Sequence, residues 1–579
     1  MHLQSMKKLL SLGLLWLLLY QLACTSSSNK ETPLRIRLPH DPESLHPLSY
    51  GNAHALQLIN LIYQSLLTVE IGSKEIQPLL AKGLPVVKIE DSLSYFTYQI
   101  RPEARWDDGR QVTALDVAFS LKLLYSPLLD NERWRAQYHF IKDLQLSKED
   151  PLAFAIVCSG YTPEMKLLTG DFFVLPAHKF DAKGRLADFS LPLLKSKYDS
   201  LASSPEFKAL AQEISHPRMA RDTAWVRGSG PYKLVSWNNG QYLTLAKKKE
   251  WWGDALQATS PSYKANPQTI QFQILEDNAA AALALKAKQI DVMDNIPLPS
   301  FQEMEKDADF KKHFSLFTAP TFDLVFLGMN GDSQKLHDKT TRQALSRLVN
   351  IPVIIKNVQG GFANPTVGMV HPEEKHYYNA SLAPITFNLT QAQELLKKAG
   401  WQKNEDGWFK DNGKEKLKLK LSLMYRGGNS EFESIALLFQ QNAKAIGIPV
   451  SLQGIESSQI TQRLQERAYD LYIRTFVGNP FSYNLMPILH TSSSGADGGN
   501  VTSFGNATTD QLLEKIAKED ARESKAILLK QLQEEMQKES NMVFLYFQQN
   551  KIAVSTRVDS VIISSLKPGY DLPKFVLKK

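Results

Sequence analysis

Three aspartates in the stretch RWDDGRQVTALDVAFSL (residues 105–121) are the first candidates for chemistry. Asp107, Asp108 and Asp116 lie within ten positions. Carboxylates that converge on one point could hold a divalent metal ion or supply the acid and base of a hydrolase. Aspartates are also common in turns and at helix starts, so the surrounding elements must decide between the two interpretations.

The pattern around these aspartates favours the structural interpretation. Residues 94–100 alternate in character with a period of two, which is typical of a half-buried strand. Asp108-Gly109 follows as a turn pair, because glycine accepts a positive φ without steric cost. Thr113 and Asp116 have the spacing of a capping box, with Asp as a shorter substitute for Glu. We therefore expect Asp108 in a turn and Asp116 at a helix start.

Short motifs of common enzyme classes are absent from the sequence. It contains no H-E-x-x-H, C-x-x-C, G-x-S-x-G or G-x-x-x-x-G-K-[ST]. Gly228 and Gly230 form a Gly-x-Gly, but Pro231 follows directly, which excludes a dinucleotide-binding loop. The tryptophan pair at 251–252 could stack on a ligand, and we expect it in the core or on the surface of a lobe. These observations predict a protein that is not an enzyme and that needs no cofactor.

One histidine cluster is a candidate for metal binding. His371 and His376 lie near Glu373 and Glu374, and both residue types are metal ligands. The other histidines are dispersed along the chain. A solvated polar loop is the favoured interpretation, so no metal site is expected.

Length and composition limit the classes of protein. A chain of 579 residues is too long for one core, so two or three domains are expected. With 43% hydrophobic and 22% charged residues, it resembles a folded soluble protein. The formal charge is +7, but no dense Lys/Arg tract with interleaved aromatic residues occurs. We expect no nucleic-acid partner.

The first residues indicate export. A basic start is followed by an apolar run at residues 9–20, which is shorter than the roughly 20 residues that span a bilayer. The run ends in QLAC, which resembles a bacterial lipoprotein cleavage box whose cysteine becomes acylated. We expect residues 1–23 to be a signal peptide, Cys24 to carry the lipid and residues 24–30 to form a polar tether. An ordinary signal peptide with an incidental cysteine is the alternative.

The compartment follows from the same segment. We expect a lipid-anchored protein on the periplasmic side of the cell envelope. After removal of the signal peptide, Cys158 is the only cysteine apart from Cys24. No intramolecular disulfide is therefore expected, and every domain must be held by its core.

Strands alternate with helices between residues 390 and 476. Thr390 and Gln393 have the spacing of a helix start, and Gly400 follows the expected helix end. Turn pairs at 406–407 and 412–413 precede a strand in which leucines alternate from 417 to 423. The further elements expected are a helix at 431–446, a strand at 448–455, a helix at 457–467 and a strand at 470–476. This order predicts a mostly parallel sheet, with ligands beyond its carboxyl edge near residues 476–479.

Several segments together resemble one known family. They are RPEARWDDGRQVTALDVAFSL, DPESLHPLSY (41–50), GSGPYKLVSW (228–237), DKTTRQALSRLVN (338–350) and AQELLKKAGW (392–401). They are similar to segments of the bacterial extracellular solute-binding proteins of family 5, the dipeptide- and oligopeptide-binding components of ABC importers. The resemblance extends from about residue 33 to the end of the chain.

The resemblance implies an α/β, two-lobe periplasmic binding protein fold of class II ("Venus flytrap"), with an extra domain in the first lobe. The implied ranges are 31–62, 225–312 and 541–579 for lobe I, 63–224 for the extra domain and 313–540 for lobe II. Such a protein would be a monomer that captures a small solute and delivers it to a membrane permease, and in this family the expected solute is a peptide. A nickel chelate, a sugar or a signalling molecule as solute, and an envelope hydrolase with paired carboxylates, are the alternatives.

The resemblance also implies a ligand site in the cleft. Its residues would be Tyr50, Asn52, Arg474, Phe476, Gly478, Asn479 and Asn500. In peptide-binding members an Asp near position 479 pairs with the α-amino group of the ligand, whereas this chain has Asn479, which cannot neutralise that charge. Arg474 would make the site less favourable for a cation if it points inward. We therefore expect weak binding of peptides with free N-termini, unless another acid such as Asp497 substitutes.

Overall fold

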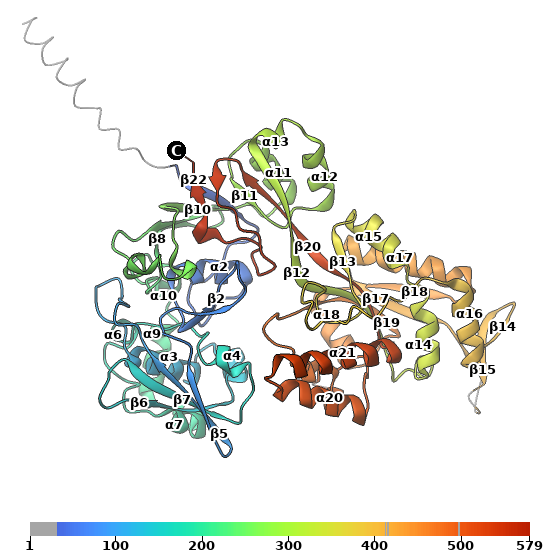
Figure 1. The fold of residues 1–579 in the computed structure, drawn as a ribbon, viewed down its shortest axis with the longest axis horizontal. Coiled ribbons are helices and arrows are strands. Elements are labelled where there is room, and N and C mark those ends of the chain that lie inside the picture. The colour runs from blue at the N-terminus through green and yellow to red at the C-terminus, as the bar shows by residue number, and fades with distance from the viewer. Residues whose placement is uncertain (1–31, 412, 414–415, 496–497, 579) are drawn as a thin grey trace, which may run out of the picture.

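The computed structural model describes residues 32–411, 413, 416–495 and 498–578. Cys24 and the tether therefore lie outside the described residues. Figure 1 shows two bodies joined by the long strands β12 (Phe314–Met329) and β20 (Met542–Ser555). We call residues 32–313 with 556–578 the first body and residues 330–541 the second body. In the described ranges no helix is both long and apolar enough to cross a membrane.

One eleven-stranded sheet continues through both bodies. Its order is β18-β17-β19-β12-β20-β11-β1-β10-β9-β8, and β13 (Ala363–Pro365) pairs with β20. The second body contributes β17 (Leu421–Arg426), β18 (Val450–Ile455) and β19 (Leu471–Val477). The first contributes β1 (Leu34–Leu38), β8 (Tyr232–Asn238), β9 (Tyr242–Lys247), β10 (Thr269–Ile274) and β11 (Val292–Met293).

The predicted parallel order is confirmed for β17, β18 and β19, whereas the whole sheet is mixed. Strand β17 is parallel to β18 and β19, as the alternation with α17 (Ser430–Ala445) and α18 (Ser457–Gln465) predicts. Strand β12 is antiparallel to both β19 and β20, and β20 is also antiparallel to β11. The sheet is mixed because these two strands enter it from distant parts of the chain.

Local details of the second body differ from the expectation in two places. Helix α16 (Leu389–Lys398) is capped by Asn388, whose side chain accepts from Gln391 N at 2.9 Å, and Thr390 is already helical. Asn388 has an extended backbone just before the helix, so its side-chain oxygen reaches the N–H groups of the first turn. Thr390 lies inside the helix and cannot take this position. The leucine strand is also split: β16 (Lys416–Lys418) joins β14 (Gln402–Asn404) and β15 (Gly407–Asp411) in a small sheet, and β17 starts at Leu421.

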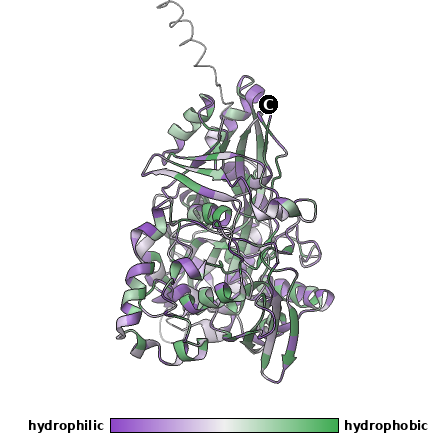
Figure 2. Cartoon of the chain, turned by 90° about the vertical axis from the view of Figure 1, so that its left-hand side faces the viewer, coloured by the Kyte–Doolittle hydropathy of each residue, from purple (hydrophilic) through white to green (hydrophobic). Residues whose placement is uncertain are grey.

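The first body contains a second, smaller sheet within residues 63–224. It consists of β4 (Val86–Glu90), β5 (Leu93–Gln99), β7 (Ala153–Ser159) and β6 (Ile141–Leu146), in that order. Burial alternates along β5 as predicted from residues 94–100. In Figure 2 many helices on this side carry both hydrophilic and hydrophobic stretches, as expected where one face packs on a core.

Asp108 and Asp116 have structural roles. Asp108 Oδ1 accepts from Arg110 N at 3.1 Å in a turn where Gly109 has φ +83°. Asp116 lies at the start of α3 (Ala114–Leu124), and its Oδ2 accepts from Thr113 N at 2.9 Å. Both expectations are confirmed. Asp116 is also buried, which the sequence pattern did not indicate.

The GSGPY segment packs against α2 (Ala53–Ile62). A Cβ added to Gly228 or Gly230 would lie 2.5 or 2.7 Å from the carbonyl oxygen of Ile62, so only glycine fits this close approach. Gly230 N donates to the same oxygen at 2.9 Å. Trp251 and Trp252 both donate their indole N–H to Ser229 O, at 2.8 and 2.9 Å. The motif therefore serves packing, and Trp251 belongs to the core as expected.

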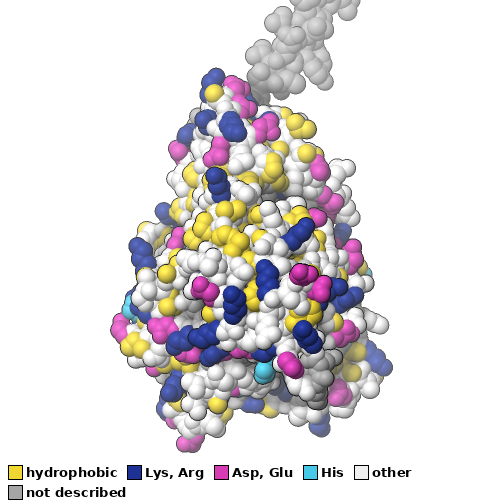
Figure 3. All heavy atoms as spheres, turned by 90° about the vertical axis from the view of Figure 1, so that its right-hand side faces the viewer, with side chains coloured by type: hydrophobic (Ala, Val, Ile, Leu, Met, Phe, Trp, Pro, Cys, Tyr) yellow, Lys and Arg dark blue, Asp and Glu magenta, His cyan; other side chains and the backbone are white. Residues whose placement is uncertain are grey.

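Hydrophobic packing covers both faces of the sheet in the second body. Along β12, Val325 and Leu327 belong to one buried cluster, whereas Leu324 and Phe326 belong to another. One cluster in the first body includes residues of the large sheet and of the four-stranded sheet, such as Ile36 and Phe96. On the outside, Figure 3 shows basic and acidic side chains interspersed over the face of the second body.

Candidate functional site

A cavity of about 830 Å³ lies between the two bodies. Its volume is within the range of small-molecule sites. The first body supplies most of the wall, including Tyr50, His54, Trp134, Tyr138, Asp171 and the C-terminal segment 564–574. The crossing strands add Pro320, Thr321, Asp323 and Asn550, and the second body adds Asn479 and Phe481. Aromatic rings and a few polar groups therefore meet in one space.

The crossing strands carry an irregularity beside this cavity. Strands β12 and β20 pair from Phe314 to Gly328, but the register shifts between Val325 and Phe326 and, over a longer interval, between Pro320 and Leu324. Inside this interval Thr321 Oγ1 donates to Gln548 O at 2.8 Å, so a side chain replaces part of the ladder. A local break in the ladder is a place where a strand pair can bend or twist. This irregularity lies where the chain crosses between the two bodies.

The bodies also touch away from the crossing strands. Asp520 of the second body accepts hydrogen bonds from Tyr161 Oη and Lys166 Nζ of the first, both at 2.8 Å. Ser482 Oγ donates to Glu164 Oε1, again at 2.8 Å. The hydrogen bond from Lys166 is the main reason that the pKa of Asp520 lies below its usual value. We call Tyr161, Glu164, Lys166, Ser482 and Asp520 the latch.

Two of the predicted site residues line the cavity. The ring of Tyr50 packs against Trp134, with ring centroids 5.7 Å apart, and lies under the guanidinium of Arg133. Asn479 lies just beyond the end of β19, at the predicted carboxyl edge of the sheet. Its side-chain oxygen accepts from Phe481 N at 2.9 Å, which leaves the amide N–H groups available.

Three neighbours of Asn479 face elsewhere. Arg474 is exposed on β19 opposite Phe326, and it is not among the residues that line the cavity. Phe476 packs at the edge of a hydrophobic cluster of the second body. Gly478 N donates to Phe322 O at 2.9 Å, and a Cβ there would lie equally close to that oxygen.

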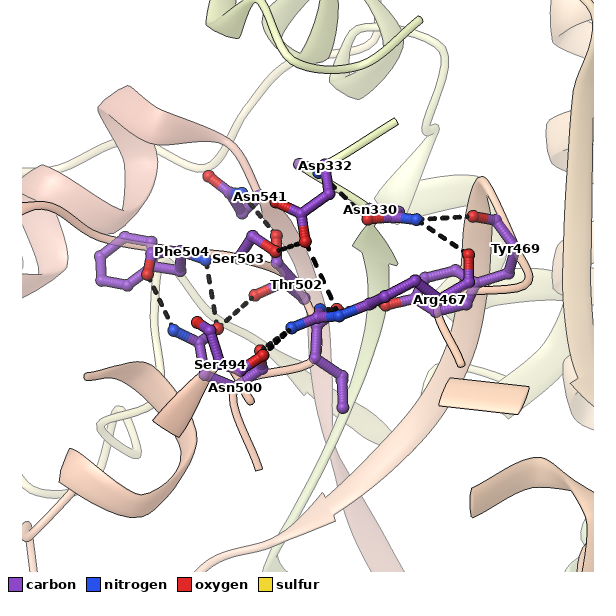
Figure 4. A network of polar contacts seen from close by, with 12 residues as sticks. Asn330, Asp332, Arg467, Tyr469, Ser494, Asn500, Thr502, Ser503, Phe504 and Asn541 are labelled. Atoms are coloured by element: carbon purple, nitrogen blue, oxygen red, sulfur yellow. Dashed lines mark hydrogen bonds and ion pairs between the residues drawn. The ribbon is translucent and has the colours of Figure 1, made fainter. Parts of the chain in front are cut away.

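Asn52 and Asn500 use their side chains for the chain's own backbone. Asn52 caps α2 and accepts from Ala55 N at 2.8 Å. Asn500 is fully buried, donates to the carbonyl oxygens of Leu489, His490 and Phe504, and accepts from Phe504 N. Figure 4 shows Asn500 in a network that also contains Arg467 and Asn541. Asp497, the predicted substitute acid, lies outside the described residues.

His371 is buried, so the expectation of a solvated loop is wrong for this residue. Its ring lies between those of Phe322 and Phe547, with centroids 5.2 and 4.5 Å away. Burial lowers the pKa of His371 to about 4. Its Nδ1 accepts from Glu373 N at 3.1 Å. Among the residues that the structure describes, no group of three or more potential ligands is arranged to hold a metal ion.

The cavity wall contains carboxylates that the sequence did not single out. Glu70 and Asp571 both contact Lys574, in a buried ion cluster that ties residue 70 to the C-terminal segment. Asp323 Oδ2 lies 3.1 Å from Lys567 Nζ. Asp171 Oδ1 accepts from Tyr138 Oη at 2.7 Å, and burial raises the pKa of Asp171 to about 7. No local pattern marks these residues, because each depends on contacts between distant segments.

Comparisons with known proteins agree with this architecture. A model of the family described as bacterial extracellular solute-binding proteins, family 5 (middle part), matches residues 75–498. The oligopeptide-binding protein AppA of Bacillus subtilis (strain 168) is 22% identical over 551 residues, which cover 93% of this chain and 90% of AppA.

Solved structures are similar over nearly the whole chain. The structure of Bacillus subtilis AppA in complex with a nonapeptide has a TM-score of 0.67 at 20% identity, and the match covers 95% of this chain and 99% of AppA. The structure of NikZ from Campylobacter jejuni in complex with Ni(L-His) has a TM-score of 0.68 at 18% identity, and covers 94% of this chain and 99% of NikZ. The predicted two-lobe α/β fold is confirmed.

Proposed function

The chain belongs to the bacterial extracellular solute-binding proteins of family 5, and from this membership we propose that it captures a peptide between its two bodies and delivers it to the permease of an ABC importer. The observation that carries the proposal is the cavity of about 830 Å³ whose wall combines both bodies and the strands that join them. A solute in this cavity contacts both bodies at once, so it stabilises their closed arrangement.

The proposed activity is binding without a chemical step. Members of the family are solute-binding proteins and not enzymes. In the described part of the cavity wall, Glu70, Asp571 and Asp323 pair with lysines, and this pairing makes them unsuited to act as an acid and base pair. We also propose that the protein acts as a monomer, which is consistent with a site formed within one chain.

Ligand identification by mass spectrometry tests this function. The protein is purified without denaturation, and the bound material is released with acid and analysed. We expect peptides, and adding them back should raise the melting temperature while the peptides are recovered unchanged. At a free concentration of about 100 times Kd, binding stabilises the folded state by about 2.7 kcal/mol. Cleaved or modified peptides would contradict the binding-only proposal.

A nickel complex is the second candidate solute. It is favoured by the similarity to NikZ, whose structure contains Ni(L-His). Metal analysis of the same purified sample separates the two candidates. Stoichiometric nickel together with a small chelator, and no peptide, would replace the peptide proposal by this one.

We further propose that Cys24 is acylated and anchors the protein on the periplasmic side of a membrane. The proposal rests on the apolar run and the QLAC ending of the first 24 residues. Cells grown with radiolabelled palmitate should label the wild-type protein and not Cys24→Ser. Cys158→Ser is the matched control and should be labelled fully, because Cys158 is buried in β7. Equal labelling of wild type and Cys24→Ser would contradict the anchor.

A further inference from the structure

Asp171 occupies an aromatic part of the cavity wall in the first body. It follows helix α5 (Met165–Leu168) and precedes Phe172 and Phe173. The rings of Tyr50, Trp134 and Tyr138 form a contiguous series next to it, with centroid distances of 5.7 Å for the first pair and 6.2 Å for the second. All of these residues line the cavity.

The carboxylate of Asp171 has one hydrogen-bond donor within the described chain. Tyr138 Oη donates to Asp171 Oδ1 at 2.7 Å. Asp171 lines the cavity, and the residue is only partly buried. It is therefore accessible from the cavity. A ligand donor can approach it without breaking a bond within the protein.

Asp171 differs from the other carboxylates of the cavity wall in its charge environment. Glu70, Asp571 and Asp323 form ion pairs with lysines. Burial raises the pKa of Asp294 to about 6, but the nearby charge of Arg37 opposes this shift. Within the described residues no lysine, arginine or histidine pairs with Asp171. A desolvated carboxylate without a counter-charge is unfavourable, and burial accordingly raises its pKa to about 7. If Asp171 served only as the hydrogen-bond partner of Tyr138, its position in the cavity wall would have no role.

We propose that Asp171 binds an ammonium group of the solute, with Tyr138 holding the carboxylate in place. The inference rests on the proposed capture of a peptide and names the chemistry that its site recognises. The ammonium is either the α-amino group of the peptide or a lysine side chain. A negative charge from the first body would then do what Asn479 of the second body cannot, which is to neutralise a bound cation.

The neighbouring aromatic rings contribute to the shape of the proposed site more than to its attraction for a cation. The guanidinium of Arg133 lies 4.2 Å from the ring centre of Tyr50 and 4.4 Å from that of Trp134. These rings therefore already have a cation over one face. In the proposed site, the preference for an ammonium over a neutral group therefore comes from Asp171. Substitution of Asp171 alone then tests the proposal.

Calorimetry with two matched peptide pairs tests the proposal. The first pair is Ala-Ala-Ala and its acetylated form, which differ in the α-ammonium. The second is acetyl-Ala-Lys-Ala and acetyl-Ala-norleucine-Ala, which differ in the side-chain ammonium. Wild type should prefer the charged member of one pair about tenfold or more, as expected for a hydrogen-bonded charge. The pair that shows the preference identifies the source of the ammonium.

Asp171→Asn keeps an oxygen that can accept from Tyr138 but removes the charge, so the preference should fall below about threefold. Asp188→Asn removes the same charge from an exposed position of the same body and should keep the wild-type preference. Asp171→Leu repeats the test without a buried amide, and melting curves confirm that each variant is folded. A preference that survives in both Asp171 variants, or no preference in wild type, would overturn the inference.

The outcomes also separate this inference from the proposed function. If wild type binds peptides and Asp171 has no effect, only the role of Asp171 is wrong. If wild type binds no peptide of either pair and none co-purifies, the proposed function fails and the inference fails with it.

Discussion

Lys166 Nζ lies 2.8 Å from Asp520 Oδ2, although the two residues are 354 positions apart and belong to different bodies. Tyr161 Oη donates to the same oxygen. The contact therefore exists only when the bodies approach each other, and it reports on closure. Its side chains are nearly half exposed, at 43% for Lys166 and 48% for Asp520, so solvent screens it strongly.

Asp520→Asn should weaken closure slightly. Exposed ion pairs contribute about 1 kcal/mol or less, so the affinity for a peptide that co-purifies should fall by no more than about fivefold. The effect should disappear in about 1 M salt, where screening is nearly complete. Calorimetry at low and high salt measures both. Glu535→Gln is the control, since Glu535 pairs with Lys538 inside one helix, α21 (Arg522–Glu539). Equal losses for the two variants would show that the latch has no special role.

Gly230→Ala should destabilise the protein because the new Cβ would lie 2.7 Å from the Ile62 carbonyl oxygen. Relief of this overlap must move α2 or β8, at a cost of about 1–3 kcal/mol. Gly83→Ala is the matched control: nothing lies within 4 Å of its added Cβ, and stability should change by about 1 kcal/mol or less. Urea unfolding measures both. A neutral Gly230→Ala would mean that the close packing there is dispensable.

Asp116→Ala should cost more than the loss of a simple helix cap. Asp116 also accepts from Ala177 N at 2.9 Å and from Trp106 Nε1 at 3.3 Å, so three N–H donors lose their acceptor. We expect a loss of at least about 2 kcal/mol, above the usual range of a cap, in urea unfolding. Asp108→Ala, at the exposed turn, should change stability by about 0.5 kcal/mol or less. Peptide affinity should stay the same in both variants. Lost binding with full stability in Asp116→Ala would assign Asp116 to the site.

His371 should make the protein sensitive to mild acid. Burial lowers its pKa from 6.5 to about 4, so the unfolded chain binds a proton between these values that the folded chain does not. Stability therefore rises with pH across this window, and acidification to pH 4 removes up to about 3 kcal/mol through this residue. His46, also buried with a pKa of about 4, acts in the same direction.

His371→Asn retains an acceptor for Glu373 N and should reduce this pH dependence. Urea unfolding at pH 7 and pH 5 measures the difference between wild type and variant. His139→Asn, at an exposed position, should keep the wild-type dependence. If His371→Asn loses as much stability on acidification as wild type, the acid sensitivity has another origin.

Local patterns in the sequence predicted local structure well. The turn at Asp108 and the helix start at Asp116 depend on a few adjacent residues, and both are present. The parallel order of β17, β18 and β19 follows from the alternation of helices and strands. Asn388 shows the limit of this reasoning, because several polar residues near a helix start can act as its cap and the backbone selects one.

Contacts between distant segments were not predictable in the same way. The antiparallel crossing of β12 and β20 brings together strands more than 200 positions apart. The burial of His371 depends on Phe322 and Phe547 from those two strands. The environment of Asp171 depends on Tyr138, which a single sequence does not connect to it. The residues inferred from family resemblance, such as Asn500, were placed by position and not by the contacts that a fully buried amide makes.

The register shift between Pro320 and Leu324 limits how the two bodies can move. Because β12 and β20 are hydrogen-bonded to each other on both sides of the shift, the bodies cannot slide or separate independently. Bending and twisting at the irregular part of the pair are the motions that this pairing leaves open. A distance between two probes, one on each body, should therefore change on ligand capture while the crossing strands stay paired.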